Sequence, residues 1–260
     1  MAIPGLQGCG MQKFEVAPLN TATVNLHAAI TLPATYAKTA SDDVFLATSL
    51  ATDHHLKMAA GGDVAVGDIL KDAAKAELVI VTDIALAPTY TVTRGYRNTT
   101  RVSHSAAATW NKVGITVPLV LLATELAACP QLLNVKGATT GTLTGNVTIY
   151  GKNIMGQTIS EVVALSNSNA VPTTKAFKVA TSVDVPCLVT AGDTVSLGVT
   201  KAMGLPAKVP ALERMFIHNF DGTTDAGSVT YDAADVSKCL YTPAGTPNGV
   251  KKVTLYYVTV

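Results

Sequence analysis

The chain has 260 residues, a formal net charge of +1 from 19 basic and 18 acidic side chains, and only 14% charged residues. Apolar residues make up 48% of the sequence, which is too many for an intrinsically disordered chain. The near-neutral balance lacks the basic surplus expected of a nucleic-acid-binding protein, and the many Thr and Val residues favour β-structure.

The N-terminal sequence MAIPGLQGCGMQKF has no cationic segment followed by an apolar run and no small-residue cleavage site, so we predict no secretory signal. The longest apolar stretch, 115–128, is interrupted by Pro118 and Glu125. It is also shorter than the roughly 20 residues that cross a bilayer. We therefore expect a soluble chain that is made in a cytoplasm and has no membrane partner.

Signals in the first part of the chain are mixed. Residues 1–20 hold several prolines and glycines, which disfavour helix and central strand, so we predict an extended arm. In an assembly, an arm of this sort often lies across a neighbour. Two short strands are predicted within 23–32, and the Ser and Asp residues of 40–43 could cap a short helix. The sequence does not distinguish helix from strand in the runs 44–50 and 71–77.

The β signal is clear from Leu78 onward. The runs 78–81 and 90–93 read as strands, and the polar, Ala-rich stretch 98–114 is interpreted as a loop. Residues 145–150 and 158–165 are predicted to form a hairpin with a longer connection. Further strands are expected at 176–179, 194–199, 215–219, 228–231 and 252–260.

Together these elements predict an all-β fold with few short helices. Its parts would be an extended N-terminal arm (1–20), an N-terminal β module (21–118) and a C-terminal β-sandwich domain (119–260). Many short strands at regular spacing, separated by turns, are typical of sandwiches and barrels.

The four cysteines, Cys9, Cys129, Cys187 and Cys239, show no C-x-x-C spacing. We expect reduced thiols that behave as small apolar side chains, and no zinc site. Cys9, in the Gly-rich start, is the one thiol that we consider for a bond between chains.

Metal binding is considered at one place, the cluster Asp53-His54-His55, with His104 or Asp63 as a third ligand. Adjacent residues of a strand point to opposite faces, so neighbouring histidines rarely bind one ion together. A solvated loop is the preferred interpretation. The isolated His27 and His218 are expected to be structural.

Catalytic signatures are weak. Ser103-His104-Ser105 is a chance-level match to a nucleophilic triad, and there is no G-x-S-x-G, P-loop or dinucleotide-binding motif. The acidic residues are scattered, and no paired-carboxylate signature stands out. We predict no enzyme activity, no catalytic residue, no cofactor and no metal.

Two other features suggest binding surfaces. Trp110, the sole tryptophan, could be an exposed platform for sugar stacking, although a core residue at a domain junction is preferred. Arg94, Arg97 and Arg101, with Lys71 and Lys75, could form a positive patch for an acidic capsid surface or for nucleic acid. A solvated loop is the preferred interpretation, and the neutral total charge argues against DNA as the main ligand.

Two stretches resemble β modules of tailed-bacteriophage structural proteins. The first, 63–108, contains VGDI (66–69), TVTRGY (91–96) and an NTT…H segment ending at His104, although Asn98 stands where the module has Gly. The second, 131–206, contains GNVTI, GQTISE, TKAF, AGDTVSLG and GLP in the order typical of a recurrent β-sandwich of phage structural proteins.

This resemblance implies a virion structural protein, with a capsid decoration (cement) protein as the leading expectation. A neck, tail or baseplate component, or a sugar-binding tail or fibre module, is the alternative. The implied partners are the major capsid protein or other virion proteins. A homo-oligomer, with a trimer favoured, would assemble in the cytoplasm of a bacterial host.

Overall fold

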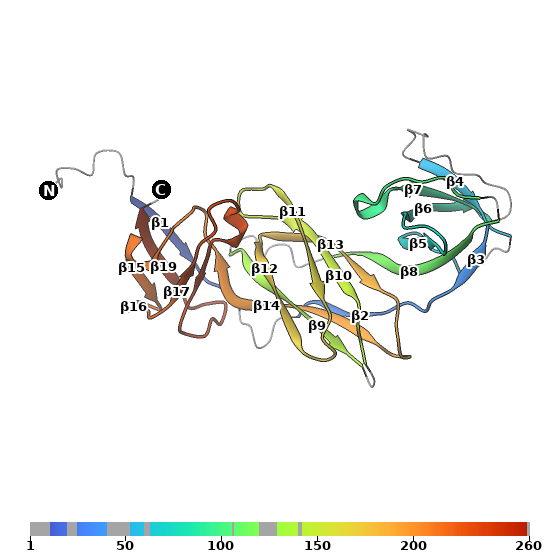
Figure 1. Ribbon diagram of the computed structural model, residues 1–260. Coiled ribbons are helices and arrows are strands. Elements are labelled where there is room, and N and C mark those ends of the chain that lie inside the picture. Colours follow the sequence, from blue (N-terminus) through green and yellow to red (C-terminus); the bar gives the residue numbers. More distant parts are fainter. Residues whose placement is uncertain are drawn as a thin grey trace. The chain divides into compact units, whose positions relative to one another are not determined.

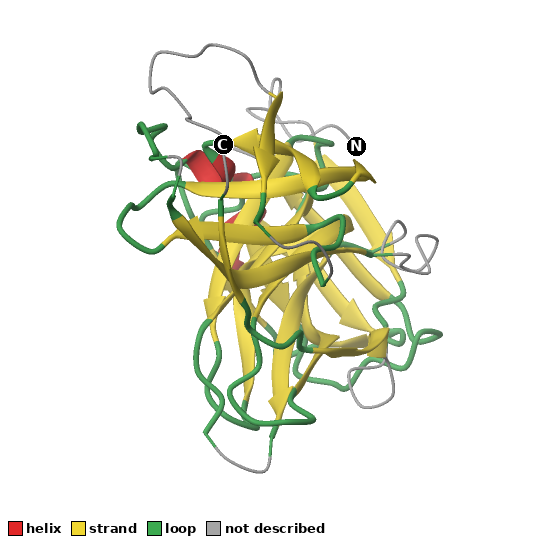
Figure 2. Ribbon diagram, turned by 90° about the vertical axis from the view of Figure 1, so that its right-hand side faces the viewer, coloured by secondary structure: helices red, strands yellow, loops and turns green. Residues whose placement is uncertain are grey.

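The computed structural model of the chain describes residues 11–19, 25–40, 53–59, 63–105, 107–119, 129–139 and 142–258 (Figure 1). Strands dominate this part of the chain, which has three short 3-10 turns and no α-helix (Figure 2). The all-β prediction is therefore confirmed. The turns are η1 (Tyr96–Asn98), η2 (Leu212–Arg214) and η3 (Val236–Lys238).

The strands, in chain order, are β1 (Met11–Val16), β2 (Asn25–Thr31), β3 (Ala37–Thr39), β4 (Asp53–Lys57), β5 (Asp68–Asp72), β6 (Leu78–Leu86), β7 (Thr89–Arg94), β8 (Thr109–Pro118), β9 (Gln131–Ala138), β10 (Asn146–Lys152), β11 (Thr158–Ala164), β12 (Ala170–Phe177), β13 (Val179–Pro186), β14 (Thr194–Gly204), β15 (Met215–Phe220), β16 (Thr223–Thr224), β17 (Ser228–Thr230), β18 (Leu240–Thr242) and β19 (Val253–Val258). Several show the expected alternation. In β7, for example, each half-buried residue is followed by a buried one.

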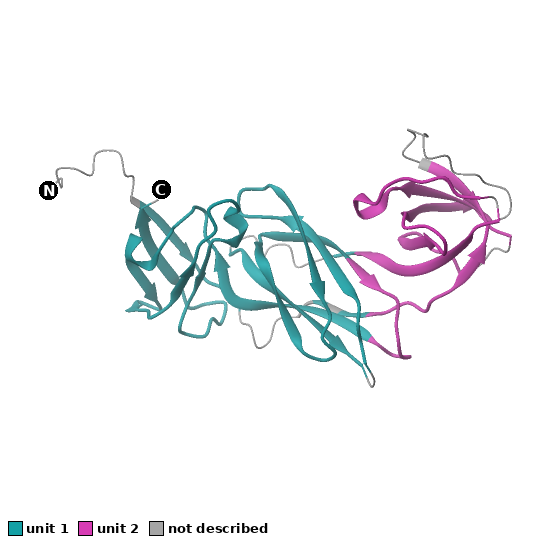
Figure 3. Cartoon of the chain, in the orientation of Figure 1, with its two compact units in different colours: residues 1–30, 118–183, 194–260 teal, residues 31–117, 184–193 magenta. Residues whose placement is uncertain are grey.

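The chain forms two compact units (Figure 3). Unit 1 contains residues 1–30, 118–183 and 194–260, and unit 2 contains 31–117 and 184–193. The sequence placed the division at 118/119 in a continuous chain. In the structure 184–193 joins unit 2, because Leu188 N–H donates to the Pro33 carbonyl and Leu32 N–H donates to the Asp193 carbonyl, at 2.9 and 3.0 Å.

The expected N-terminal arm is in part a strand. Residues 11–16 form β1, which pairs antiparallel with β19 from Met11↔Val258 to Val16↔Val253. Leu19 N–H then donates to the side chain of Gln131 at 2.8 Å. Backbone pairing with the C-terminal strand explains how this Pro-containing segment is held. The rest of the arm, 1–10 with Cys9, lies outside the described residues.

Unit 1 contains three groups of paired strands. A four-stranded sheet has the order β1-β19-β15-β16, and a six-stranded sheet has the order β12-β9-β14-β18-β17, with β2 pairing β14. The third group is β11-β10-β13. A cluster of buried side chains from the first two sheets, including Met203, Tyr241 and Leu255, forms one core of this unit.

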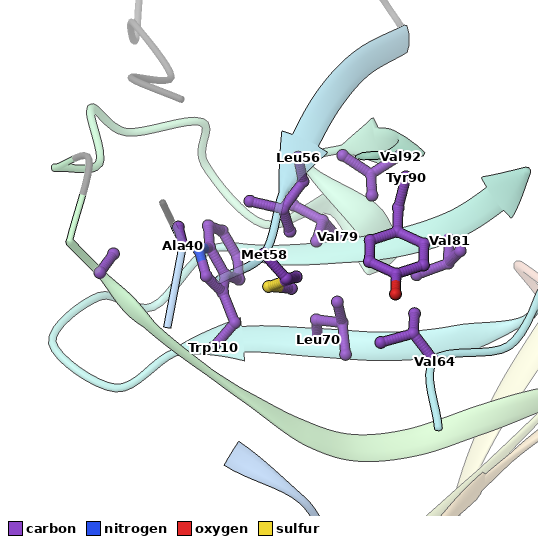
Figure 4. Packing of buried hydrophobic residues seen from close by; sticks show 11 residues of the cluster. Ala40, Leu56, Met58, Val64, Leu70, Val79, Val81, Tyr90, Val92 and Trp110 are labelled. Carbon is purple, nitrogen blue, oxygen red and sulfur yellow. The ribbon is translucent and has the colours of Figure 1, made fainter. Parts of the chain in front are cut away.

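In unit 2, the strand order is β8-β5-β6-β7-β4, and β3 pairs β8. Side chains from these strands point toward a common centre (Figure 4). That core consists of Ala40, Leu56, Met58, Val64, Leu70, Val79, Val81, Tyr90, Val92, Ala108 and Trp110. Gly114 of β8 allows the Val185 carbonyl to approach closely, since a Cβ there would lie 2.4 Å from that oxygen.

Some predicted elements were wrong. The loop expected over 98–114 ends at Ala108, because β8 begins at Thr109 and buries Trp110, Lys112 and Gly114 in alternation. The stretch expected as one strand at 176–179 contains the end of β12 and the start of β13. The open stretch 44–50 and most of the proposed cap at 40–43 lie outside the described residues.

Candidate functional site

A group of four ionisable side chains in unit 2 is joined by hydrogen bonds and ion pairs. Glu77, just before β6, receives two hydrogen bonds from Arg94 of β7, from Nε at 2.9 Å and from Nη2 at 2.7 Å. Both side chains are fully shielded from solvent. The backbone N–H groups of Gly95 and Val102 donate to the same carboxylate, at 3.1 and 2.7 Å. A bidentate pair with added backbone donors satisfies the charges that burial would otherwise penalise.

His104 extends this network. Its Nδ1 lies 2.6 Å from Asp72 Oδ2, and its Nε2 lies 2.9 Å from Glu77 Oε2. The ring also packs against the indole of Trp110, with centroids 4.7 Å apart and planes at 40°. We call Asp72, Glu77, Arg94 and His104 the ionic centre. It joins the end of β5, the start of β6, the end of β7 and the segment that precedes β8.

Glu77 is held as an anion. Burial raises the pKa of its carboxyl, but the hydrogen bonds from Arg94, Val102 N–H and His104 outweigh burial and lower that pKa to about 2. A carboxylate of this kind is a permanent acceptor at neutral pH. It is poorly matched to proton transfer, which needs a pKa near the working pH.

A hollow of about 590 Å³ lies beside the ionic centre. The hollow is lined by residues 72–75 and by residues 103–105 and 107–109. The His104 side chain is 1% exposed, so its ring is buried in the wall and does not project into the space. Lys75, Ser103 and Ser105 are the exposed polar residues of the rim.

The side chains of the ionic centre bind one another, so the arrangement favours a structural role over catalysis. In a Ser-His-acid triad one imidazole nitrogen faces the nucleophile and the other faces the acid. Here a carboxylate lies within hydrogen-bond distance of each nitrogen of His104, which is not the arrangement of a triad. Within the described ranges, no group of three or more His, Cys, Asp or Glu side chains is placed to hold a metal ion.

The other candidate metal ligands lie on one strand, where neighbouring side chains point to opposite faces. Asp53, His54 and His55 lie on β4, not in the solvated loop that the sequence favoured, and they pair with Thr93, Val92 and Thr91 of β7. His54 is half-buried and His55 is exposed, as expected for neighbours on opposite faces. His27 lies on β2, and His218 Nδ1 contacts the Asp225 carbonyl at 2.5 Å.

The first residue of the proposed basic patch, Arg94, is buried and does not contribute to a surface. Arg94 belongs to the ionic centre, so neither the patch nor the solvated-loop interpretation holds for it. Arg97 donates from Nε to Asp184 at 2.9 Å, and that buried carboxylate also accepts from Tyr96 and Thr116 hydroxyls. Lys71 and Lys75 are exposed.

Trp110 and three cysteines are interior residues. Trp110 is 1% exposed and belongs to the core of unit 2, so it is no platform for a sugar. Cys129, Cys187 and Cys239 are buried and free, in agreement with the expectation of reduced thiols. Burial raises the pKa of the Cys129 thiol to about 12, which keeps it protonated and unreactive.

Sequence reasoning missed Asp72 and Glu77 as partners of His104. Both lie in the ambiguous stretch 71–77. Along the chain, His104 is 32 positions from Asp72 and 27 positions from Glu77. The available signal was indirect: single charged residues stand at the ends of apolar β runs, at Glu77 before Leu78 and at Arg94 after Val92-Thr93.

Comparisons with known proteins give no relative. No protein-family model, no curated protein and no solved structure matches the chain. Among the described residues no helix is long and apolar enough to span a bilayer.

Proposed function

We propose that the chain is a structural component of a tailed-phage virion, in the first instance a capsid decoration protein that binds and stabilises the assembled head. The observation that carries the proposal is the pair of motif-bearing stretches that resemble phage structural modules. The first covers β5 to β7 and continues to Ala108, and the second covers β9 to β14. Both are therefore strand and turn frameworks.

The use of charge within unit 2 supports a structural role. Three of its buried carboxylates are paired with cations of the same unit: Glu77 with Arg94, Asp184 with Arg97, and Asp68 with Lys112 at 2.7 Å. Such pairs fix the packing of strands and loops. A near-zero net charge also avoids repulsion when many copies lie on one particle surface.

A binding experiment tests the role directly. Purified full-length chain is mixed with phage heads that lack their decoration protein, and co-sedimentation and the melting temperature of the heads are measured. A protein that binds only the assembled head stabilises it by RT ln(1 + [L]/Kd), about 3 kcal/mol per site at a hundredfold excess over Kd. Heat-unfolded chain is the control. Absence of both binding and thermal stabilisation would contradict the proposal.

The sugar-binding alternative loses its main residue, because Trp110 is buried. A glycan array is expected to show no binding. A neck, tail or baseplate position is distinguished from the head by locating the chain in a map of the particle.

A further inference from the structure

The four-stranded sheet of unit 1 has two unlike faces. On its inner face, Met215, Phe220, Val253, Leu255 and Tyr257 are buried in the core shared with the six-stranded sheet. The intervening residues lie on the opposite face. There the register aligns Lys13 with Tyr256 and Tyr256 with Ile217 across β1, β19 and β15.

A bulge in β15 enlarges the apolar part of this outer face. The register shifts between Met215 and Ile217, so Phe216 and Ile217 both oppose Tyr256. Their exposed fractions are 61% and 41%. Exposed aromatic and aliphatic side chains gathered on an ordered sheet are typical of the centre of a protein–protein interface.

Charges of both signs lie along one side of that apolar centre, on β1 and next to the start of β19. Lys13 Nζ lies 2.8 Å from Glu15 Oε2, and Lys252 Nζ lies 3.0 Å from Glu15 Oε1. Lys13 also reaches over the ring of Tyr256, with Nζ 5.8 Å from its centroid. We call Lys13, Glu15, Phe216, Ile217 and Tyr256 the outer patch.

The arrangement of charge decides which partner fits. A partner of one strong charge sign would be favoured by a rim of the opposite sign, but this rim carries both signs within a few ångströms. In a two-fold interface the same patch serves both partners, so it must be complementary to itself. An apolar centre with adjacent positive and negative rim groups meets that requirement.

We propose that the outer patch binds the outer patch of a second copy of this chain. The apolar centres pack together, and the lysines of each copy face the Glu15 carboxylate of the other. The inference does not depend on the virion role, since it follows from the sheet face alone.

The first test is sedimentation velocity on the full-length chain over a range of concentrations. The unaltered protein is expected to show a concentration-dependent dimer. The variant F216S/I217S is expected to dimerise about tenfold or more weakly, because large apolar side chains at the centre of an interface contribute most of its affinity. Met155→Ser, at a residue with the same exposed fraction of 61% but outside the patch, is the control and should behave as the unaltered chain.

The second test uses charge. Lys13→Glu makes the Lys13/Glu15 part of the rim acidic, and Glu15→Lys makes it basic. Each variant alone should dimerise more weakly than the unaltered chain, whereas an equimolar mixture should form a heterodimer, because its facing rims have opposite signs. Circular dichroism spectra like that of the unaltered chain would establish that the variants are folded.

Several outcomes would overturn the inference. These are a monomer at every concentration, an unchanged dissociation constant in F216S/I217S, or a trimer without preferential mixing of the two charge variants. Dimerisation that begins only after residues 1–10 are deleted would identify the chain's own N-terminal segment as the cover of the patch. That result would also overturn the inference.

Discussion

Replacing Glu77 by Gln tests whether the ionic centre holds unit 2 together. The substitution keeps the shape of the side chain but removes its charge and turns one acceptor oxygen into a donor group. Arg94, fully buried, would then lose its anionic partner. Gly95 N–H, Val102 N–H and His104 would compete for the one remaining oxygen.

Two independent estimates give the size of the effect. Removing one partner of a buried ion pair costs about 3–5 kcal/mol. The fall of the Glu77 pKa from 4.5 to about 2 corresponds to about 3 kcal/mol of preference for the folded, ionised state. We therefore expect E77Q to lower the free energy of unfolding of unit 2 by about 3 kcal/mol or more.

The chain contains a suitable reporter for this measurement. Trp110 is the single tryptophan, and it is buried beside His104 in the same unit. Urea unfolding followed by tryptophan fluorescence therefore reports on unit 2. The transition midpoint of E77Q should fall by about 1.5 M or more, taking a urea dependence of about 2 kcal/mol per M. Glu213→Gln, at an exposed residue, is the control and should change the free energy by less than about 0.5 kcal/mol. A loss below about 1 kcal/mol in E77Q would refute the reasoning.

The remaining predictions concern pH and packing. Because the pKa of folded Glu77 lies below its unfolded value, its contribution is present above about pH 4.5 and is lost as pH falls toward 2. Acid titration of unfolding should show this loss in the unaltered chain, and a smaller loss in E77Q. Burial and the bond to Asp225 raise the pKa of Tyr241 well above its usual range, so stability should fall as pH rises above 10, and Tyr241→Phe should reduce that fall in alkaline unfolding curves. Gly151→Ala should lower the melting temperature of unit 1 by several degrees, because its Cβ would lie 2.0 Å from the Val179 carbonyl. Ser160→Ala, at an exposed position on the paired strand, should not, and equal melting temperatures for the two variants would contradict the close-approach argument.

Local sequence signals predicted the strands whose side chains alternate. Thr194 to Val199 reads as apolar–polar alternation, and its buried positions in β14 follow that pattern. The hairpin of β10 and β11 was found for the same reason, together with the turn residues between its strands. In these segments one face of the strand meets a core, so the pattern is visible without knowledge of the partner strand.

Strands whose burial depends on distant partners were missed. β4 begins with Asp53-His54-His55, which looks like a solvated loop, and it becomes a strand through pairing with β7. β8 follows an Ala-rich polar stretch and carries Lys112, whose ammonium group is neutralised by Asp68. The ionic centre was hidden for the same reason, because its four members come from four separate segments.

The return of 184–193 to unit 2 separates parts of one unit in time during synthesis. A ribosome releases 31–117 first, but Arg97 then has no Asp184 and Leu32 has no Asp193 carbonyl to bind. Unit 2 therefore lacks these two hydrogen bonds while the intervening 66 residues emerge (118–183). A fragment ending at residue 117 would lack them permanently, whereas adding 184–193 in trans as a peptide should restore them.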